Sequence, residues 1–156
     1  MAVETERKFL VCNDYWKAEP HNPVILIRQG YLSADPLCAV RVRTANESAY
    51  LTIKGERQGL SCKEYEWHVA YADALELLQM CATPIIEKTR HIVCHDNLKW
   101  EIDVFEGAHA GLVVAEIEFS GETSTELLRL PVWIGREVSY DPRYTNAYIA
   151  KHGIPL

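Results

Sequence analysis

The side chains of this chain best suited to chemistry are charged residues that recur in pairs, two positions apart. Because successive side chains of a β-strand leave opposite faces, this spacing places both members of a pair on one face. The acidic pairs are Glu4/Glu6, Glu64/Glu66, Glu101/Asp103 and Glu116/Glu118, and the bases are Arg41/Arg43, Lys88/Arg90, Lys8 after the first acidic pair, and Lys54 after Thr52. Arginine and lysine match phosphate oxygens, and carboxylates bind the hard ions Mg²⁺ and Mn²⁺. The combination predicts a site for a triphosphate with divalent metal ions.

A single charged pair more often marks the solvated face of an antiparallel sheet than a functional site. Here seven successive segments each carry a polar pair, mostly charged, on one face and apolar residues on the other. Burying so many charges without a ligand would cost each ion its hydration. We therefore expect the charged faces to meet inside a water-filled barrel, around a polyanion and its metal ions. The alternative is a plain β-barrel with solvated charged faces, which predicts no metal-dependent ligand binding.

Strands joined by short turns are the elements needed to hold these faces. Alternating and β-branched patterns predict eight strands, at residues 3–11, 24–33, 38–44, 48–54, 61–69, 85–94, 99–105 and 112–120. Helices are predicted at 73–81, at 124–130, and at 142–151, the last starting after Asp141 and ending before Gly153. We predict a mainly β (α+β) fold, an eight-stranded antiparallel closed tunnel barrel with a few covering helices, in one domain over residues 1–156.

Composition narrows the function classes. The 156 residues carry a net charge of -6, which argues against general nucleic-acid binding but allows a small anionic ligand where positive charge is concentrated. No apolar run of about 18 residues suggests a membrane span, and no signal-peptide pattern is present. The five cysteines are scattered without a C-x-x-C pair, which indicates free thiols. We expect a cytoplasmic protein that binds neither nucleic acid nor membrane.

The order of the charged segments resembles the CYTH superfamily, the triphosphate tunnel metalloenzymes, and within it the short bacterial inorganic-triphosphatase type. The matching motifs are E-x-E-x-K at Glu4, Glu6 and Lys8, R-x-R at Arg41 and Arg43, T-x-K at Thr52 and Lys54, E-x-E at Glu64 and Glu66, E-K-x-R with Lys88 and Arg90, the acidic strand with Glu101 and Asp103, and the final E-x-E at Glu116 and Glu118. Residues 27–32 (IRQGYL) and 135–148 are also similar to short bacterial members. Each motif alone is weak, but seven in order cover nearly the whole chain.

The resemblance implies a tunnel-shaped barrel that acts on triphosphates with Mg²⁺ or Mn²⁺, two ions per active site. The implied phosphate-binding residues are Lys8, Arg41, Arg43, Lys54, Lys88 and Arg90, with Tyr31 at the terminal phosphate or the tunnel mouth. The implied metal ligands are Glu4, Glu6, Glu116 and Glu118, and the candidate catalytic residues are Glu4, Glu6, Lys8 and Glu118. Supporting roles fall to Glu64, Glu66, Glu101 and Asp103. The last helix would plug, gate or cap one end of the barrel.

The resemblance favours metal-dependent hydrolysis of inorganic tripolyphosphate to pyrophosphate and phosphate. Alternatives on the same fold are a class IV adenylyl cyclase and a thiamine or nucleoside triphosphatase. Cyclases of this group tend to carry His-Phe before Arg41, where this chain has Ala39 and Val40. An alternative of another class is a non-catalytic polyphosphate-binding module, which needs the bases but not the carboxylates. A homodimer would cover aromatic side chains on the outside of the barrel, such as Tyr65 and Trp67.

Overall fold

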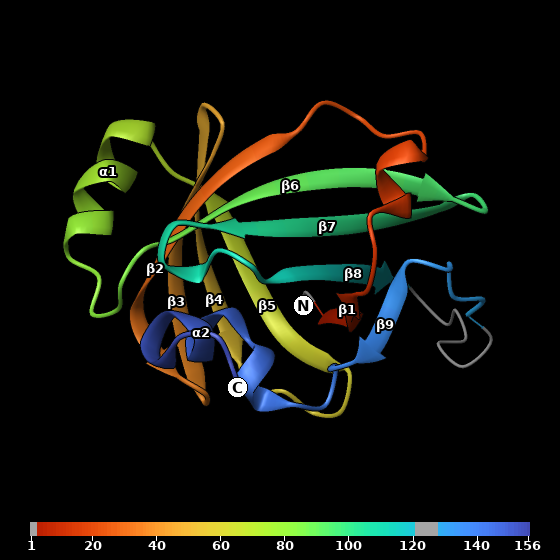
Figure 1. Ribbon diagram of the computed structural model, residues 1–156. Coiled ribbons are helices and arrows are strands. Elements are labelled where there is room, and N and C mark those ends of the chain that lie inside the picture. The colour runs from red at the N-terminus through yellow and green to blue at the C-terminus, as the bar shows by residue number, and fades with distance from the viewer. Residues whose placement is uncertain (1–2, 121–127) are drawn as a thin grey trace.

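The computed structural model describes residues 3–120 and 128–156, in which eight of the nine strands curve into a closed antiparallel barrel and the ninth pairs with one of them (Figure 1). The strands are β1 (Val3–Val11), β2 (Ile25–Asp35), β3 (Cys38–Ala45), β4 (Ser48–Gly55), β5 (Ser61–His68), β6 (Ile86–His95), β7 (Leu98–Glu106), β8 (Val113–Phe119) and β9 (Ile134–Glu137). Their order is β5-β4-β3-β2-β6-β7-β8-β1, and pairing of β1 with β5 closes the ring. β9 pairs with the second half of β1, beyond the residues that pair with β5.

The eight strands of the ring follow the sequence prediction to within two residues at each end. Their hairpins have the turn chemistry that tight connections require. In the two-residue turn between β6 and β7, Asp96 and Asn97 both have positive φ, 49° and 61°. The mainly β fold with a closed eight-stranded antiparallel barrel is confirmed, whereas the short strand β9 was not predicted.

The described residues also contain two α-helices, α1 (Tyr71–Gln79) and α2 (Asn146–His152), and the single-turn 3₁₀ helices η1 (Tyr15–Ala18), η2 (Gly107–His109) and η3 (Pro142–Tyr144). α1 begins and ends two residues earlier than its predicted range of 73–81. The prediction of one continuous helix at 142–151 is wrong, because Thr145 has an extended backbone and its hydroxyl caps α2 by accepting from the Tyr148 N–H at 3.2 Å. The predicted helix at 124–130 lies mostly outside the described residues. None of the helices described has the length and apolarity that crossing a membrane requires.

The chain itself covers part of the apolar outer surface of the barrel. Trp100 of β7 and Trp133 are fully buried there, with ring centroids 5.4 Å apart, and Trp16 of η1 belongs to the same cluster. α1 covers the outer face of β3 and β4. On β5, Tyr65 and Trp67 stay 42% and 51% exposed. Other segments of the chain therefore cover the outer face of β7, whereas Tyr65 and Trp67 on the outer face of β5 stay exposed to solvent.

The inside of the barrel has one apolar end, which we call the apolar plug. Its buried residues are Tyr31, Ile86, Phe105, Leu112, Val114, Val138, Tyr144, Ile149 and Ala150. The last four lie after β9, on the segment that carries η3 and α2. In Figure 1 this blue segment lies against the end of the barrel near β2 and β3. α2 therefore contributes apolar side chains that close one end of the interior.

Candidate active site

The strand register gathers the predicted site residues on the inner face of the barrel. Residues directly opposite each other on neighbouring strands share a face. Across β1 and β8, Lys8 lies opposite Glu116 and Glu6 lies opposite Glu118. The same register places Arg41 opposite Thr52, Thr52 opposite Glu66, Lys54 opposite Glu64, Arg90 opposite Asp103, and Glu101 opposite Glu116. We call the inward-facing charged residues of these strands, together with Glu4, Arg43 and Lys88, the charged chamber.

On β6 and β7 the chamber holds an ion network centred on Asp103. Lys88 Nζ lies 2.7 Å from Asp103 Oδ2, and Arg90 Nε lies 2.7 Å from Asp103 Oδ1. Arg90 also contacts Glu101 Oε2 at 2.7 Å. Burial acts to raise the pKa of Asp103, but Arg90 and Lys88 outweigh it and hold this pKa well below its usual range. Asp103 therefore stays ionised and fixes two cations in place.

On β3, β4 and β5 positive charge exceeds negative charge. Arg41 and Arg43 share one carboxylate, with their Nη2 atoms 3.6 Å and 3.4 Å from Glu66 Oε2. The same oxygen accepts a hydrogen bond from Thr52 Oγ1 at 2.7 Å. Burial, Arg41 and Arg90 lower the pKa of Arg43 to about 10. This side of the chamber has fewer carboxylates than bases, and a phosphate group would supply the additional negative charge.

On β1 and β8 negative charge exceeds positive charge. Burial, with Glu116 nearby, raises the pKa of Glu6, and burial together with Glu4 raises the pKa of Glu118. Glu4 is paired with Lys54, whose Nζ lies 2.6 Å from Glu4 Oε2. Because the carboxylates of β1 and β8 outnumber the bases on these two strands, a divalent cation would add favourable interactions on this side.

Lys8 connects the acidic side of the chamber to the C-terminal segment. Its Nζ lies 3.2 Å from Glu116 Oε1 and donates to the Tyr144 carbonyl at 3.1 Å. Burial acts to lower the pKa of Lys8, but Glu116 and Glu6 outweigh it and raise this pKa. Burial likewise acts to raise the pKa of Glu116, whereas Lys8 and other bases hold it at about 2. Both groups are therefore charged at neutral pH.

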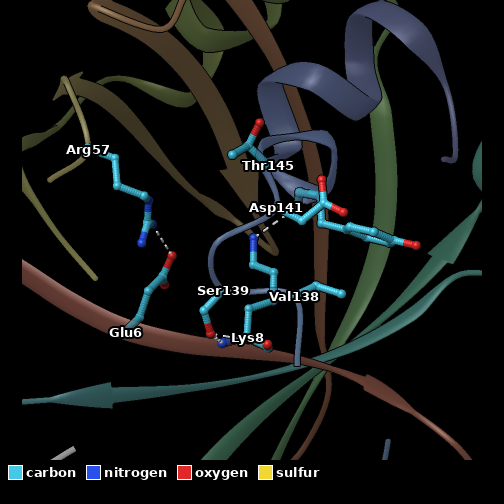
Figure 2. Close-up of a pocket in the computed structure, with 8 residues that line it drawn as sticks. Glu6, Lys8, Arg57, Val138, Ser139, Asp141 and Thr145 are labelled. Carbon is cyan, nitrogen blue, oxygen red and sulfur yellow. Dashed lines mark hydrogen bonds and ion pairs between the residues drawn. The ribbon is translucent and has the colours of Figure 1, made fainter. Parts of the chain in front are cut away.

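Two further residues enter the chamber that the sequence patterns did not single out. Arg57, in the turn between β4 and β5, donates to Glu6 Oε1 at 2.8 Å, and Figure 2 shows it reaching toward β1. Asn146, the first residue of α2, accepts from Lys88 Nζ at 3.1 Å. A cavity of about 10 Å³ lies beside Glu6, Lys8 and Arg57, with room for about one water. Because one residue is in a turn and the other in a helix, neither follows the two-residue spacing that revealed the rest.

Tyr31 lies opposite Arg41 on the inner face of the barrel, next to the chamber. Its side chain is buried in the apolar plug with Ile86 and Phe105, at the closed end of the interior. Placement of Tyr31 at an open tunnel mouth therefore does not match the structure, because apolar packing surrounds it. Contact with a terminal phosphate stays a prediction.

The carboxylates of β1 and β8 fit a hard divalent cation in their chemistry, since they are oxygen donors in a region of excess negative charge. Within residues 3–120 and 128–156, no three His, Cys, Asp or Glu side chains converge closely enough to hold an ion. Three of the four predicted ligands are held by cationic side chains instead: Glu4 by Lys54, Glu6 by Arg57, and Glu116 by Lys8. A metal ion that binds these carboxylates would displace the cationic side chains from them.

Two curated proteins named inorganic triphosphatase are similar to this chain over nearly its full length. The protein of Acetivibrio thermocellus is 42% identical over 153 residues, which are 97% of this chain and 96% of that protein. The protein of Nitrosomonas europaea is 34% identical over 150 residues, which are 95% of this chain and 97% of that protein.

A solved structure and a family model indicate the same family as these two relatives. A crystal structure of the inorganic triphosphatase NE1496 is 31% identical, with a TM-score of 0.68, and the match covers 96% of this chain and 95% of that one. The model of the CYTH domain matches residues 2–144, a range that contains every charged strand pair of the chamber. The chain therefore belongs to the CYTH domain family.

Proposed function

We propose that this protein hydrolyses inorganic tripolyphosphate to pyrophosphate and phosphate, with Mg²⁺ or Mn²⁺ bound in the charged chamber. The observation that carries the proposal is the separation of charge inside one barrel. Bases are in excess near β3, where Arg43 has a lowered pKa, and carboxylates are in excess on β1 and β8, where Glu6 and Glu118 have raised ones. A triphosphate with its metal ions complements both sides. Similarity to two inorganic triphosphatases over at least 95% of this chain supports the same activity.

In this mechanism the basic residues bind and orient the phosphate chain. Arg41 and Arg43 can each offer two parallel N–H groups to phosphate oxygens, while Lys88 and Arg90 are held in position by Asp103. Their fixed positive charge stabilises the negative charge that develops on the phosphate oxygens during transfer. A water molecule forms the new P–O bond as a bridging P–O bond breaks, which releases pyrophosphate and phosphate.

Carboxylates on the opposite side would hold the metal ions. The candidate ligands are Glu4, Glu6, Glu116 and Glu118. When bound there, the metal supplies neutralisation of phosphate charge and a water of lowered pKa. Glu64, Glu66 and Glu101 act by orienting the bases, as Glu66 does with both arginines of β3.

The test is phosphate release from tripolyphosphate, ATP and pyrophosphate, each measured with Mg²⁺, with Mn²⁺ and with chelator. Fast metal-dependent release from tripolyphosphate, with little from ATP, is the expected result. Formation of cyclic AMP and pyrophosphate from ATP would replace the proposal with a cyclase. Binding without turnover, and independent of metal, would replace it with a binding module.

A matched pair of arginine variants ties the activity to the chamber. Arg41 faces the interior, whereas Arg28 lies on the outer face of β2, half-exposed beside Glu87. Arg41→Ala should lower kcat/KM for tripolyphosphate by about 10²-fold or more, since loss of one such donor has that effect in other active sites. Arg28→Ala should leave kcat/KM unchanged. Equal activity in the two variants would remove the chamber from the mechanism.

A further inference from the structure

Gln29 lies at the boundary between the charged chamber and the apolar plug. On β2 its Cα is opposite Arg43 of β3 on one side and opposite Ile86 of β6 on the other. Arg43 belongs to the chamber and Ile86 to the plug, so the glutamine faces inward between the two. Its side chain has no exposed surface.

Several buried polar atoms around this boundary have no hydrogen-bond partner in the part of the chain that the structure describes. Among the described residues, Gln29 Nε2 and Oε1 have no hydrogen-bond partner, and neither do the buried Nε atoms of Arg41 and Arg43. An unpaired buried amide is unfavourable, because it has lost its hydrogen bonds to water and gained none. The local donors are in excess: each arginine can only donate, and the amide offers both a donor and an acceptor. The missing partner must therefore supply several acceptors.

A phosphate group at the end of a chain supplies them, because it has three non-bridging oxygens that accept hydrogen bonds. A phosphate that is bonded on both sides has only two. The plug supports the same assignment on steric grounds, because Ile86, Phe105 and Val114 fill the interior beyond Gln29. A nucleoside attached to the phosphate at this position would have no room.

We propose that Gln29 binds the leading, unsubstituted terminal phosphate of a triphosphate, donating from Nε2 to an anionic oxygen. The proposal rests on the proposed function and specifies it further: a substrate must enter the chamber with a free phosphate end. Tripolyphosphate has two free ends and ATP has one, so both can present such an end. P¹,P³-di(adenosine-5′) triphosphate has none and is excluded.

The test measures binding of these three compounds by calorimetry in chelator, without turnover. Gln29→Met keeps the length of the side chain but removes its donor and acceptor. We expect affinity for tripolyphosphate and for ATP to fall by the same factor, about 10- to 100-fold, as for loss of a hydrogen bond to a charged group. Diadenosine triphosphate should bind weakly to both proteins and equally well. Unchanged affinity for tripolyphosphate, or an equal loss for diadenosine triphosphate, would overturn the proposal.

Thermal unfolding distinguishes ligand binding from a structural role. Because the amide has no hydrogen-bond partner within residues 3–120 and 128–156, replacing it by an apolar side chain of similar length should leave the melting temperature unchanged or raise it. A folded Gln29→Met protein with a lower melting temperature and unchanged affinity for tripolyphosphate would assign Gln29 a structural role and overturn the proposal. Gln79→Met makes the same chemical change at the exposed end of α1 and should alter neither stability nor affinity.

A second variant covers the case in which Gln29→Met does not fold. Gln29→Glu places a carboxylate beside the excess positive charge of Arg41 and Arg43, so it should fold at least as stably as the wild type. The same carboxylate repels a phosphate, and affinity for tripolyphosphate should fall by about 100-fold or more. Unchanged affinity would show that no phosphate lies beside residue 29. The proposed function fails separately, when the wild-type protein releases no phosphate from tripolyphosphate with metal present.

Discussion

The two ends of the barrel interior lie on the same strands yet have opposite chemistry. On β7, Asp103 belongs to the charged chamber and Phe105, two positions further on the same face, belongs to the apolar plug. On β8 the corresponding residues are Glu116 and Val114. The antiparallel register also places apolar residues of neighbouring strands side by side, since Leu10 of β1 lies opposite Val114. β7, β8 and β1 each therefore contribute both a charged and a packing residue to the interior.

The comparison indicates that stability and function are separated along the barrel axis. Burial of the plug removes apolar surface from water, which favours folding. The chamber has the opposite balance in several places: the amide of Gln29 is unpaired, the charged form of Arg43 is disfavoured, and so are those of Glu6 and Glu118. We infer that the plug compensates for a chamber that is kept ready for ligand.

The largest effect on stability is expected from the plug. Ile149 of α2 is 1% exposed, and Ile149→Ala should lower the free energy of unfolding by about 2–5 kcal/mol. Leu75→Ala, at an exposed position of α1, should change it by less than about 0.5 kcal/mol. Urea denaturation measures both variants. An equal, small effect at the two positions would mean that α2 does not contribute to the core.

A chamber variant should show the reverse pattern. Arg43→Met keeps the aliphatic stem but removes a guanidinium whose charged form is disfavoured by burial and by Arg41. We expect unchanged or higher stability together with a fall of about 10²-fold in kcat/KM for tripolyphosphate. Melting temperature and steady-state kinetics measure the two quantities. A destabilised variant with normal kinetics would place Arg43 on the structural side of the comparison.

The acidic side of the chamber should give the metal-free protein a two-limbed dependence of stability on pH. Glu116 has a folded pKa of about 2, below the ordinary 4.5, so its contribution is complete above pH 4.5 and is lost as the pH falls toward 2. Glu6 and Glu118 have raised pKa values, so their contribution is complete below 4.5 and is lost as the pH rises through those values. Stability in chelator should therefore pass through a maximum between these limbs.

Variants on one strand and one helix test this assignment. Glu118→Gln should flatten the decline toward neutral pH and leave the acid limb intact, because Glu116 is unchanged. Glu76→Gln, at an exposed position of α1, should leave both limbs as they are. Melting temperatures from pH 3 to pH 8 measure the profile, with the range set by the ordinary carboxylate pKa. A steady rise from acid to neutral pH in the wild type would contradict it.

The strands could be predicted from the sequence because alternation is a local property. β1 and its charged face, with Glu4 and Glu6, required only the residues themselves. The apolar plug could not be predicted, because Leu10 continues the inward face of Lys8 and nothing local shows where the interior changes from charged to packed. That change depends on docking of the C-terminal segment. The bond from Lys8 to the Tyr144 carbonyl spans 136 positions of the chain.

Short and irregular segments account for the remaining differences. β9 has four residues, too few for a two-residue period to stand out. It approaches β1 so closely that a Cβ at Gly135 would lie 3.1 Å from the Leu10 carbonyl oxygen. Arg57 reaches Glu6 from a turn, where residue spacing gives no information about direction. Turn and helix residues therefore enter the chamber through tertiary placement alone.

The smallest effect is expected where the plug and the chamber meet, at the start of α2. Thr145 caps this helix through its hydroxyl, and the next residue, Asn146, accepts from Lys88 in the chamber. Thr145→Ala should lower the free energy of unfolding by about 1 kcal/mol, the usual effect of losing a side-chain cap. Thr145→Ser keeps the hydroxyl and should restore most of it. Since the cap also positions Asn146, we expect Thr145→Ala to weaken tripolyphosphate binding slightly. A loss of stability with unchanged binding would show that α2 stabilises the fold without contributing to the site.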